Sequence, residues 1–200
     1  MGKRTVALLT DMNQPLGVMV GNAMEVRESI DILRGQGPAD VRALTLALAE
    51  VMLELGDADP ADARTVLDDG RALEYFGQII EAQGGDRGVL DDPDRLPSAQ
   101  ERIPIPAARS GTVNALDTRR IGLAGVSLGA GRIRKEDDVD PGVGIEVHVR
   151  IGDAVEAGQP LFWLCHNHRG VDAATTHLLE ATFIDDQGVT PPPLIIDRIE

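Results

Sequence analysis

The chain has 200 residues, of which 42% are hydrophobic and only 2% are aromatic, so we expect a core of aliphatic side chains. The formal net charge of -14 disfavours binding to nucleic acid or to an anionic membrane, because both need clustered Lys and Arg. The single cysteine, Cys165, excludes an intrachain disulfide, and no apolar run is long enough for a signal peptide core or a membrane span. We therefore expect a cytoplasmic protein with no nucleic-acid or membrane partner.

Residues 1–85 are typical of an α/β domain that begins on a strand. The apolar run 6–9 predicts a buried strand, and a polar turn with Pro15 and Gly17 follows it. Ligands of open α/β sheets bind where strands end and helices begin, so this turn is a candidate functional site. Apolar residues at helical spacing then predict a helix over 22–34 with Asn22 as its N-cap, and helices that begin at Pro38, at Pro60 and before Leu73.

Residues 86–106 are polar and contain several prolines, and we expect them to form a linker. The prolines of the segment 103–106 cannot donate to a sheet ladder, so this segment cannot be an interior strand. Residues 107–200 then predict a β-rich domain. Its expected elements are strands at 110–113 and 145–149, a helix from Thr118 to about Leu128 with Thr118 as its cap, and a last helix over 172–183.

The turn before the helix over 22–34 could hold a monovalent cation. Backbone carbonyls of the turn and one carboxylate, Glu28, would make a set of hard oxygen ligands with low charge. Such a set suits a monovalent cation better than a transition metal, which favours nitrogen or sulfur ligands. On the pattern alone, the favoured interpretation is that Glu28 faces solvent beside Arg27.

The segment Cys165-His166-Asn167-His168 invites comparison with a zinc site. Zinc sites of the usual kind need two ligand pairs, and His148 and His177 are the only other histidines. A cysteine nucleophile with a histidine base is also conceivable. The favoured interpretation is a strand end that runs into a turn.

Two further motifs resemble known functional sites but do not predict a function. Residues 149–164 carry Gly-Asp-x-Val-x-x-Gly-x-x-Leu, which resembles half of a biotinyl or lipoyl carrier domain, but the chain's two lysines, Lys3 and Lys135, do not lie at the hairpin tip that these carriers modify. We therefore expect a barrel-sandwich-hybrid-like fold without the carrier function. The glycines and basic residues of 128–135 could cradle an anion, and a helix C-cap followed by a solvated charge run explains them equally well.

Three separated parts of the chain together resemble thymidine and pyrimidine-nucleoside phosphorylases. They are residues 7–41, with Leu-Leu-Thr-Asp-Met-Asn-Gln-Pro-Leu-Gly and Val-Gly-Asn-Ala-Met-Glu-Val; residues 110–145, with Ser-Gly-Thr-Val and Lys-Glu-Asp-Asp-Val-Asp-Pro-Gly-Val-Gly-Ile; and residues 152–161. The resemblance implies a remnant of a mixed-sheet α/β domain followed by the C-terminal β-rich domain of this family. It also implies a pentosyltransferase that converts thymidine and phosphate to thymine and 2-deoxyribose 1-phosphate, in a homodimer when intact.

The resemblance also says which parts of the active site this chain holds. The family's phosphate-binding Lys-Ser and Gly-Gly-Thr segments, its base-binding His, Arg, Ser and Lys, and its dimer-forming α domain lie upstream of the matched region. We therefore assign no catalytic and no organic-cofactor residue here, and we expect the chain to be inactive without an N-terminal half or a second subunit. The resemblance does carry over a potassium site with the ligands Leu16, Met19 and Glu28. The alternatives are the C-terminal subunit of a split phosphorylase and a non-catalytic binding or assembly module that holds a partner with the loop 131–135 or with the β-rich domain.

Overall fold

The computed structural model describes residues 2–200, which form two compact units. The first unit comprises the residues up to Asp11, Arg27–Arg95 and Pro193–Glu200, and the second comprises Met12–Val26 and Leu96–Pro192. The units are therefore interleaved along the chain, whereas the sequence predicts consecutive segments of 1–85, 86–106 and 107–200. The interleaving arises because the last residues return to the unit that contains the first strand.

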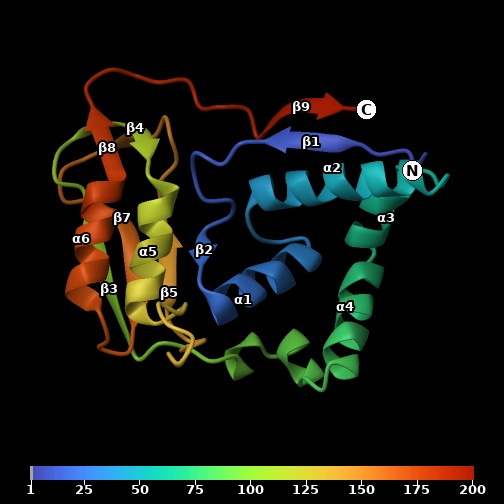
Figure 1. Ribbon diagram of the computed structural model, residues 1–200, viewed down its shortest axis with the longest axis horizontal. Helices are drawn as coiled ribbons and strands as arrows, with labels where there is room; N and C mark the ends of the chain where they lie inside the picture. Colours follow the sequence, from blue (N-terminus) through green and yellow to red (C-terminus); the bar gives the residue numbers. More distant parts are fainter. Residues whose placement is uncertain (1) are drawn as a thin grey trace. The chain divides into compact units, whose positions relative to one another are not determined.

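The first unit contains a two-stranded sheet, the helices α2 (Ala39–Leu55), α3 (Asp62–Asp68) and α4 (Arg71–Ala82), and the C-terminal part of a further helix that is described below. β1 (Ala7–Thr10) pairs antiparallel with β9 (Ile195–Ile199), so strands from the two ends of the chain lie side by side (Figure 1). The bounds of α2, α3 and α4 are close to those that the sequence predicts. They pack around an apolar cluster of Leu46, Ala63 and Leu67. Glu54 on α2 forms ion pairs with Arg4 and Arg198, which joins the helix to both ends of the chain.

Residues 86–95 belong to the first unit and are not a solvated linker. They form two short 3-10 helices, η1 (Arg87–Leu90) and η2 (Pro93–Arg95), and Val89 and Leu90 are buried. The Arg34 guanidinium donates a hydrogen bond to the carbonyl of Leu90. The prediction of a linker is thus wrong for this segment, because two of its few apolar side chains are buried although the segment as a whole is polar.

The second unit contains two antiparallel sheets and a pair of helices. The strands of the larger sheet are, in spatial order, β2 (Met19–Val20), β5 (Gly144–Val147), β7 (Pro160–His166) and β3 (Glu101–Pro106). The smaller sheet has the order β6 (Ala154–Val155), β4 (Gly111–Leu116) and β8 (Thr182–Asp185). The proline-containing β3 lies at an edge, as the sequence requires.

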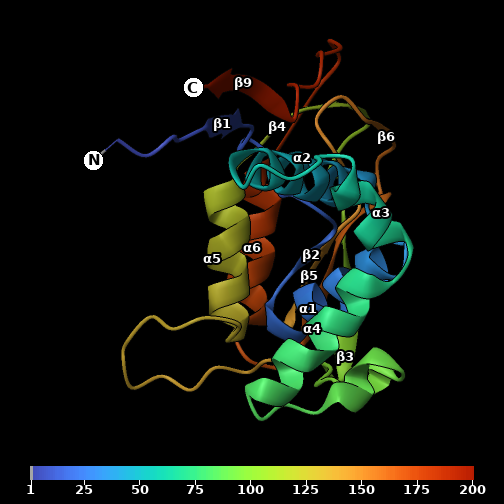
Figure 2. The ribbon, with the colours of Figure 1, turned by 90° about the vertical axis from the view of Figure 1, so that its right-hand side faces the viewer.

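The helices of this unit are α5 (Thr118–Leu128) and α6 (Val171–Ala181), which lie side by side in both views (Figures 1 and 2). The N-cap of α5 is Asp117, whose carboxylate accepts from the N–H of Arg120, and the predicted Thr118 is the first helical residue. The cap moves by one residue because either side chain can accept from the first turn.

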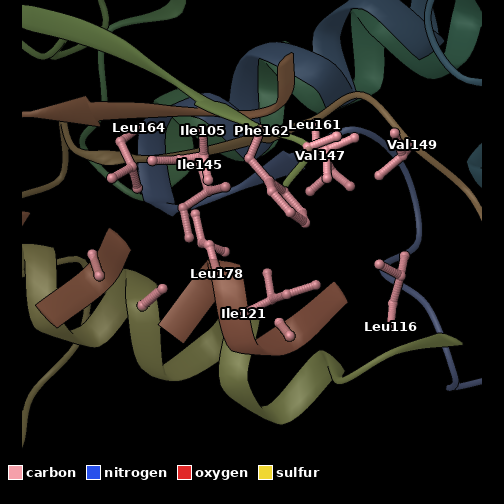
Figure 3. Packing of buried hydrophobic residues seen from close by; sticks show 14 of the residues in the cluster. Ile105, Leu116, Ile121, Ile145, Val147, Val149, Leu161, Phe162, Leu164 and Leu178 are labelled. Atoms are coloured by element: carbon pink, nitrogen blue, oxygen red, sulfur yellow. The ribbon is translucent and has the colours of Figure 1, made fainter. Parts of the chain in front are cut away.

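The core of the second unit lies between the larger sheet and this helix pair. Phe162, Leu164 and Ile145 face Ile121 of α5 and Leu178 of α6 (Figure 3), and none of the five is more than 1% exposed. Alternate residues of β7 therefore face the core, as the period of a strand requires. The structure thus shows a mixed α/β arrangement, and the barrel-sandwich description of this region stays a prediction.

One helix, α1 (Asn22–Leu33), begins in the second unit and ends in the first. At its start the carboxylate of Glu25 accepts from the N–H of Gly21 at 2.9 Å, which binds the residue before the helix to its first turn. The side-chain amide of Asn22, the predicted cap, donates to the carbonyl of Ala130. Among residues 2–200 no helix combines the length and the hydropathy needed to cross a bilayer.

Candidate functional site

The turn that the sequence singles out, 12–18, is held firmly within the second unit. The Arg150 guanidinium donates to the carbonyl of Gly17, and the N–H of Ile151 donates to Gln14 Oε1 at 3.1 Å. Gly17 has a φ of 69°, a conformation that glycine adopts at little cost. The turn is therefore fixed to the segment that follows β5, and its backbone carbonyls have defined directions.

Two of the three predicted potassium ligands, Leu16 and Met19, lie on this turn and on β2. The carbonyl of Val18 accepts from the N–H of Val147 at 2.7 Å, so Val18 faces β5. Backbone groups alternate along an antiparallel ladder, and the carbonyl of Met19 therefore points away from β5, toward the outer edge of the sheet. This direction suits a carbonyl that is to coordinate a cation outside the sheet.

The third predicted ligand, Glu28, lies on the part of α1 that belongs to the first unit. It is 8% exposed, so the interpretation that it faces solvent beside Arg27 is wrong. Because Leu16 and Met19 belong to one unit and Glu28 to the other, the potassium site stays a prediction.

The outer face of the larger sheet carries a charged network centred on Glu146. Arg102 donates to both oxygens of Glu146, at 2.9 Å and 2.5 Å, and His148 Nε2 lies 3.1 Å from the same carboxylate. The Arg102 guanidinium also lies 3.9 Å from the centre of the Trp163 ring. Burial favours the neutral form of Glu146, but the hydrogen bonds from Arg102 and His148 outweigh it and hold the pKa of this carboxyl below its usual value.

Cys165 belongs to this network and has the wrong properties for a nucleophile. Its thiol is 8% exposed and donates to Glu146 Oε1 at 3.6 Å. Burial, and then the negative charge of Glu146, raise the pKa of the Cys165 thiol from 9.0 to about 11. The catalytic-cysteine alternative is therefore disfavoured, because reactive cysteines have depressed pKa values.

The opposite face of the same sheet brings His166 and His168 together with Glu101. Glu101 on β3 is the direct cross-strand partner of His166 on β7. His166 Nε2 lies 3.8 Å from one oxygen of Glu101, and His168 Nε2 lies 3.7 Å from the other. Sequence reasoning missed Glu101, because it is 65 residues away and only strand pairing brings it to the histidines. The usable signal was the extended character of both 101–106 and 160–166.

The proposed anion cradle is occupied by a carboxylate of the chain itself. Figure 2 shows the loop that follows α5 extending away from that helix. Within the loop, the N–H groups of Ile133 and Arg134 both donate to Asp137 Oδ2, at 3.1 Å and 2.8 Å. These donors are thus satisfied internally, which favours the helix C-cap and solvated charge run over a ligand site.

Comparison with known proteins connects these features to one group of enzymes. Residues 112–185 match the family described as "Pyrimidine nucleoside phosphorylase C-terminal domain". Two relatives, both named "Pyrimidine-nucleoside phosphorylase", come from Staphylococcus aureus strains bovine RF122 / ET3-1 and USA300. Each is 44% identical over an alignment of 196 residues, and the match covers 95% of this chain and 45% of the relative.

The matched regions contain the elements described above. The family match begins in β4 and ends in β8, and so includes α5, β5, β7 and α6. The chain spans less than half the length of the curated relatives. Residues 112–185 thus match a pyrimidine nucleoside phosphorylase C-terminal domain, and the chain is similar to these enzymes over 95% of its own length but over less than half of theirs.

Proposed function

We propose that this chain is the C-terminal part of a pyrimidine-nucleoside phosphorylase that acts on thymidine, and that it has no activity by itself. The single observation that carries the proposal is the 44% identity to such phosphorylases over 95% of the chain. In the reaction, phosphate attacks C1′ of the sugar and the pyrimidine leaves, which yields thymine and 2-deoxyribose 1-phosphate. The transition state needs cationic and hydrogen-bonding groups around the departing base and the phosphate.

The described residues do not gather such groups in the features that the sequence singled out. In residues 129–140 the N–H groups of Ile133 and Arg134 bind Asp137, and in the outer-face network Arg102 is neutralised by Glu146. Phosphate and nucleoside would therefore be bound by an N-terminal half, supplied in the same polypeptide or as a second subunit. We propose a homodimer for the intact enzyme, by analogy with the family.

The proposal includes a potassium ion held by the carbonyls of Leu16 and Met19 and by the carboxylate of Glu28. The direction of the Met19 carbonyl, away from β5, supports the assignment of that ligand. A potassium ion would fix the turn 12–18 relative to whatever carries the phosphate loop. Its contribution would thus be positional, because a monovalent cation with oxygen ligands is a weak Lewis acid.

A chimaera tests the proposal. The N-terminal part of the Staphylococcus aureus enzyme, up to the first matched residue, is fused to residues 5–200 of this chain, and phosphate-dependent release of thymine from thymidine is measured. We expect activity from the chimaera and none from this chain alone. A chimaera that unfolds cooperatively on heating, and is therefore folded, but releases no thymine would contradict the proposal.

Potassium is tested in the same chimaera. Glu28→Gln removes the negative charge but keeps the size of the side chain, and Glu156→Gln removes an exposed carboxylate elsewhere. We expect activity to rise with potassium in the parent and in Glu156→Gln, and to lose this dependence in Glu28→Gln. An equal dependence of activity on potassium in the parent and in both variants would contradict the assignment of Glu28 as a ligand.

The alternative of a non-catalytic binding module has no observation in its favour. Of its two suggested surfaces, the loop 131–135 has its N–H groups at Ile133 and Arg134 already bound to Asp137, and the surface of the β-rich domain stays a prediction. A carrier function is also disfavoured, because Lys3 and Lys135 are the only lysines and neither lies in the turn between β6 and β7.

A further inference from the structure

One group of side chains in the second unit has the composition of a transition-metal site. Glu101, His166 and His168 each place one ligand atom so that the three atoms lie within 4.8 Å of one another. Glu101 and His166 are cross-strand partners on β3 and β7, so the sheet fixes their Cα positions. His168 has a φ of 67°, which is uncommon for a residue other than glycine and turns its side chain back toward His166.

His166 gives the second, independent indication of a ligand. Its side chain is only 5% exposed, and its Nε2 atom is buried without a hydrogen-bond partner. Buried polar atoms are nearly always paired, and an unpaired one needs an explanation. The nearest carboxylate oxygen, on Glu101, is 3.8 Å away, which is too long for a hydrogen bond and leaves room for an ion between the two atoms.

We propose that Glu101, His166 and His168 bind a divalent transition-metal ion of the zinc class. Two imidazoles and one carboxylate are ligands that zinc accepts, whereas magnesium and calcium prefer all-oxygen sets. Bonds of about 2.0–2.1 Å in a tetrahedral site place ligand atoms about 3.3 Å apart. The three ligand atoms now lie within 4.8 Å of one another, so the ligands must move closer together to bind the ion, and the exposed side chain of His168 is free to provide most of this movement.

The ion would add a further link between two segments that the sheet and the hydrogen bond from the N–H of Gln100 to Asn167 Oδ1 already connect. Glu101 lies at the start of β3, and His166 and His168 lie where β7 passes into the turn before α6. The fourth coordination position would be taken by water, as in other sites with three protein ligands. The net charge of -14 also favours uptake of a cation.

One hydrogen bond must open when the metal binds. His166 Nδ1 accepts from the N–H of His168 at 3.2 Å, so a neutral ring carries its proton on Nε2. A neutral ring that binds metal through Nε2 carries the proton on Nδ1 instead. Metal binding therefore breaks the hydrogen bond at Nδ1 and forms the bond between the metal and Nε2. We expect the affinity for the metal to be weaker than in a preformed structural site and to fall as the pH is lowered.

The test is metal binding to the full 200-residue chain without an affinity tag. Zinc is titrated calorimetrically, and cobalt is used as a spectroscopic probe because a four-coordinate Co²⁺ ion absorbs strongly in the visible. The ligand variants are Glu101→Gln and His168→Asn, since asparagine tolerates the positive φ at residue 168. The matched control is His148→Asn, which removes a half-exposed histidine on the opposite face of the sheet.

We expect one zinc ion per chain, the absorption of four-coordinate cobalt, and an affinity at least about tenfold lower in each ligand variant. The control should bind as the parent does. Circular dichroism of each variant shows that the fold is kept. The proposal is overturned if the parent binds no zinc, if the ligand variants bind as tightly as the parent, or if His148→Asn loses affinity to the same extent.

Discussion

Cys165 should be almost unreactive in the folded chain, and its reactivity should depend on Glu146. The thiolate is the reactive form, and a pKa of about 11 in place of 9.0 leaves about a hundredfold less thiolate at pH 8. The chain has a single cysteine, so the rate of reaction with a disulfide reagent reports on this residue alone. We expect that rate to be at least about a hundredfold lower in native buffer than in denaturant.

The variant Glu146→Gln separates the effect of charge from that of burial. Gln keeps the size of the side chain but removes the negative charge that opposes ionisation of the thiol, and it leaves Arg102 to favour the thiolate. Cys165 should therefore react faster in folded Glu146→Gln than in the folded parent, while Glu156→Gln, an exposed control, should change nothing. Native and unfolded rates that are similar, or no acceleration in Glu146→Gln, would refute the reasoning.

Three further variants test the packing and electrostatics of the second unit. Phe162→Ala should lower the free energy of unfolding by about 3–5 kcal/mol in urea titrations, because the ring is 0% exposed. Gly170→Ala should be destabilising, because the added Cβ would lie 2.0 Å from a backbone oxygen and the residue has a φ of 62°. Gly122→Ala lies in a helix where the added Cβ meets no atom, so it should be neutral or stabilising by up to about 1 kcal/mol. The pKa of Glu146 is lower in the folded chain than in the unfolded chain, so ionised Glu146 stabilises the fold above its usual pKa. This stabilisation is lost as the pH falls through the pKa of Glu146 in the folded chain. Arg102→Ala should therefore reduce the loss of unfolding free energy that is measured between pH 6 and pH 3.

Local patterns were sufficient to predict most elements of this chain. The helices that became α2, α5 and α6 follow from apolar spacing together with Pro38, Gly129 and similar boundary residues, and these signals act within a few residues. The prolines of 103–106 likewise predict an edge strand because they act through their own missing donors. Where the cause is local, the sequence is sufficient.

Pairings between distant residues could not be predicted in this way. The contact of Glu101 with His166, and the pairing of β1 with β9, depend on strand register across 65 and more than 180 residues. The expected linker failed for a related reason, because Val89 and Leu90 are buried by partners that their neighbours do not reveal. The same applies to Glu28, whose burial is invisible in the helix pattern around Arg27.

The central claim is that this chain supplies the C-terminal part of a phosphorylase whose substrate-binding groups lie elsewhere. The most direct measurement compares phosphate-dependent thymine release by the 200-residue chain alone with release by the same chain joined to the N-terminal part of its Staphylococcus aureus relative. We expect no release by the chain alone and clear release by the joined protein. Thymine release by the chain alone, or a folded but inactive joined protein, would contradict it.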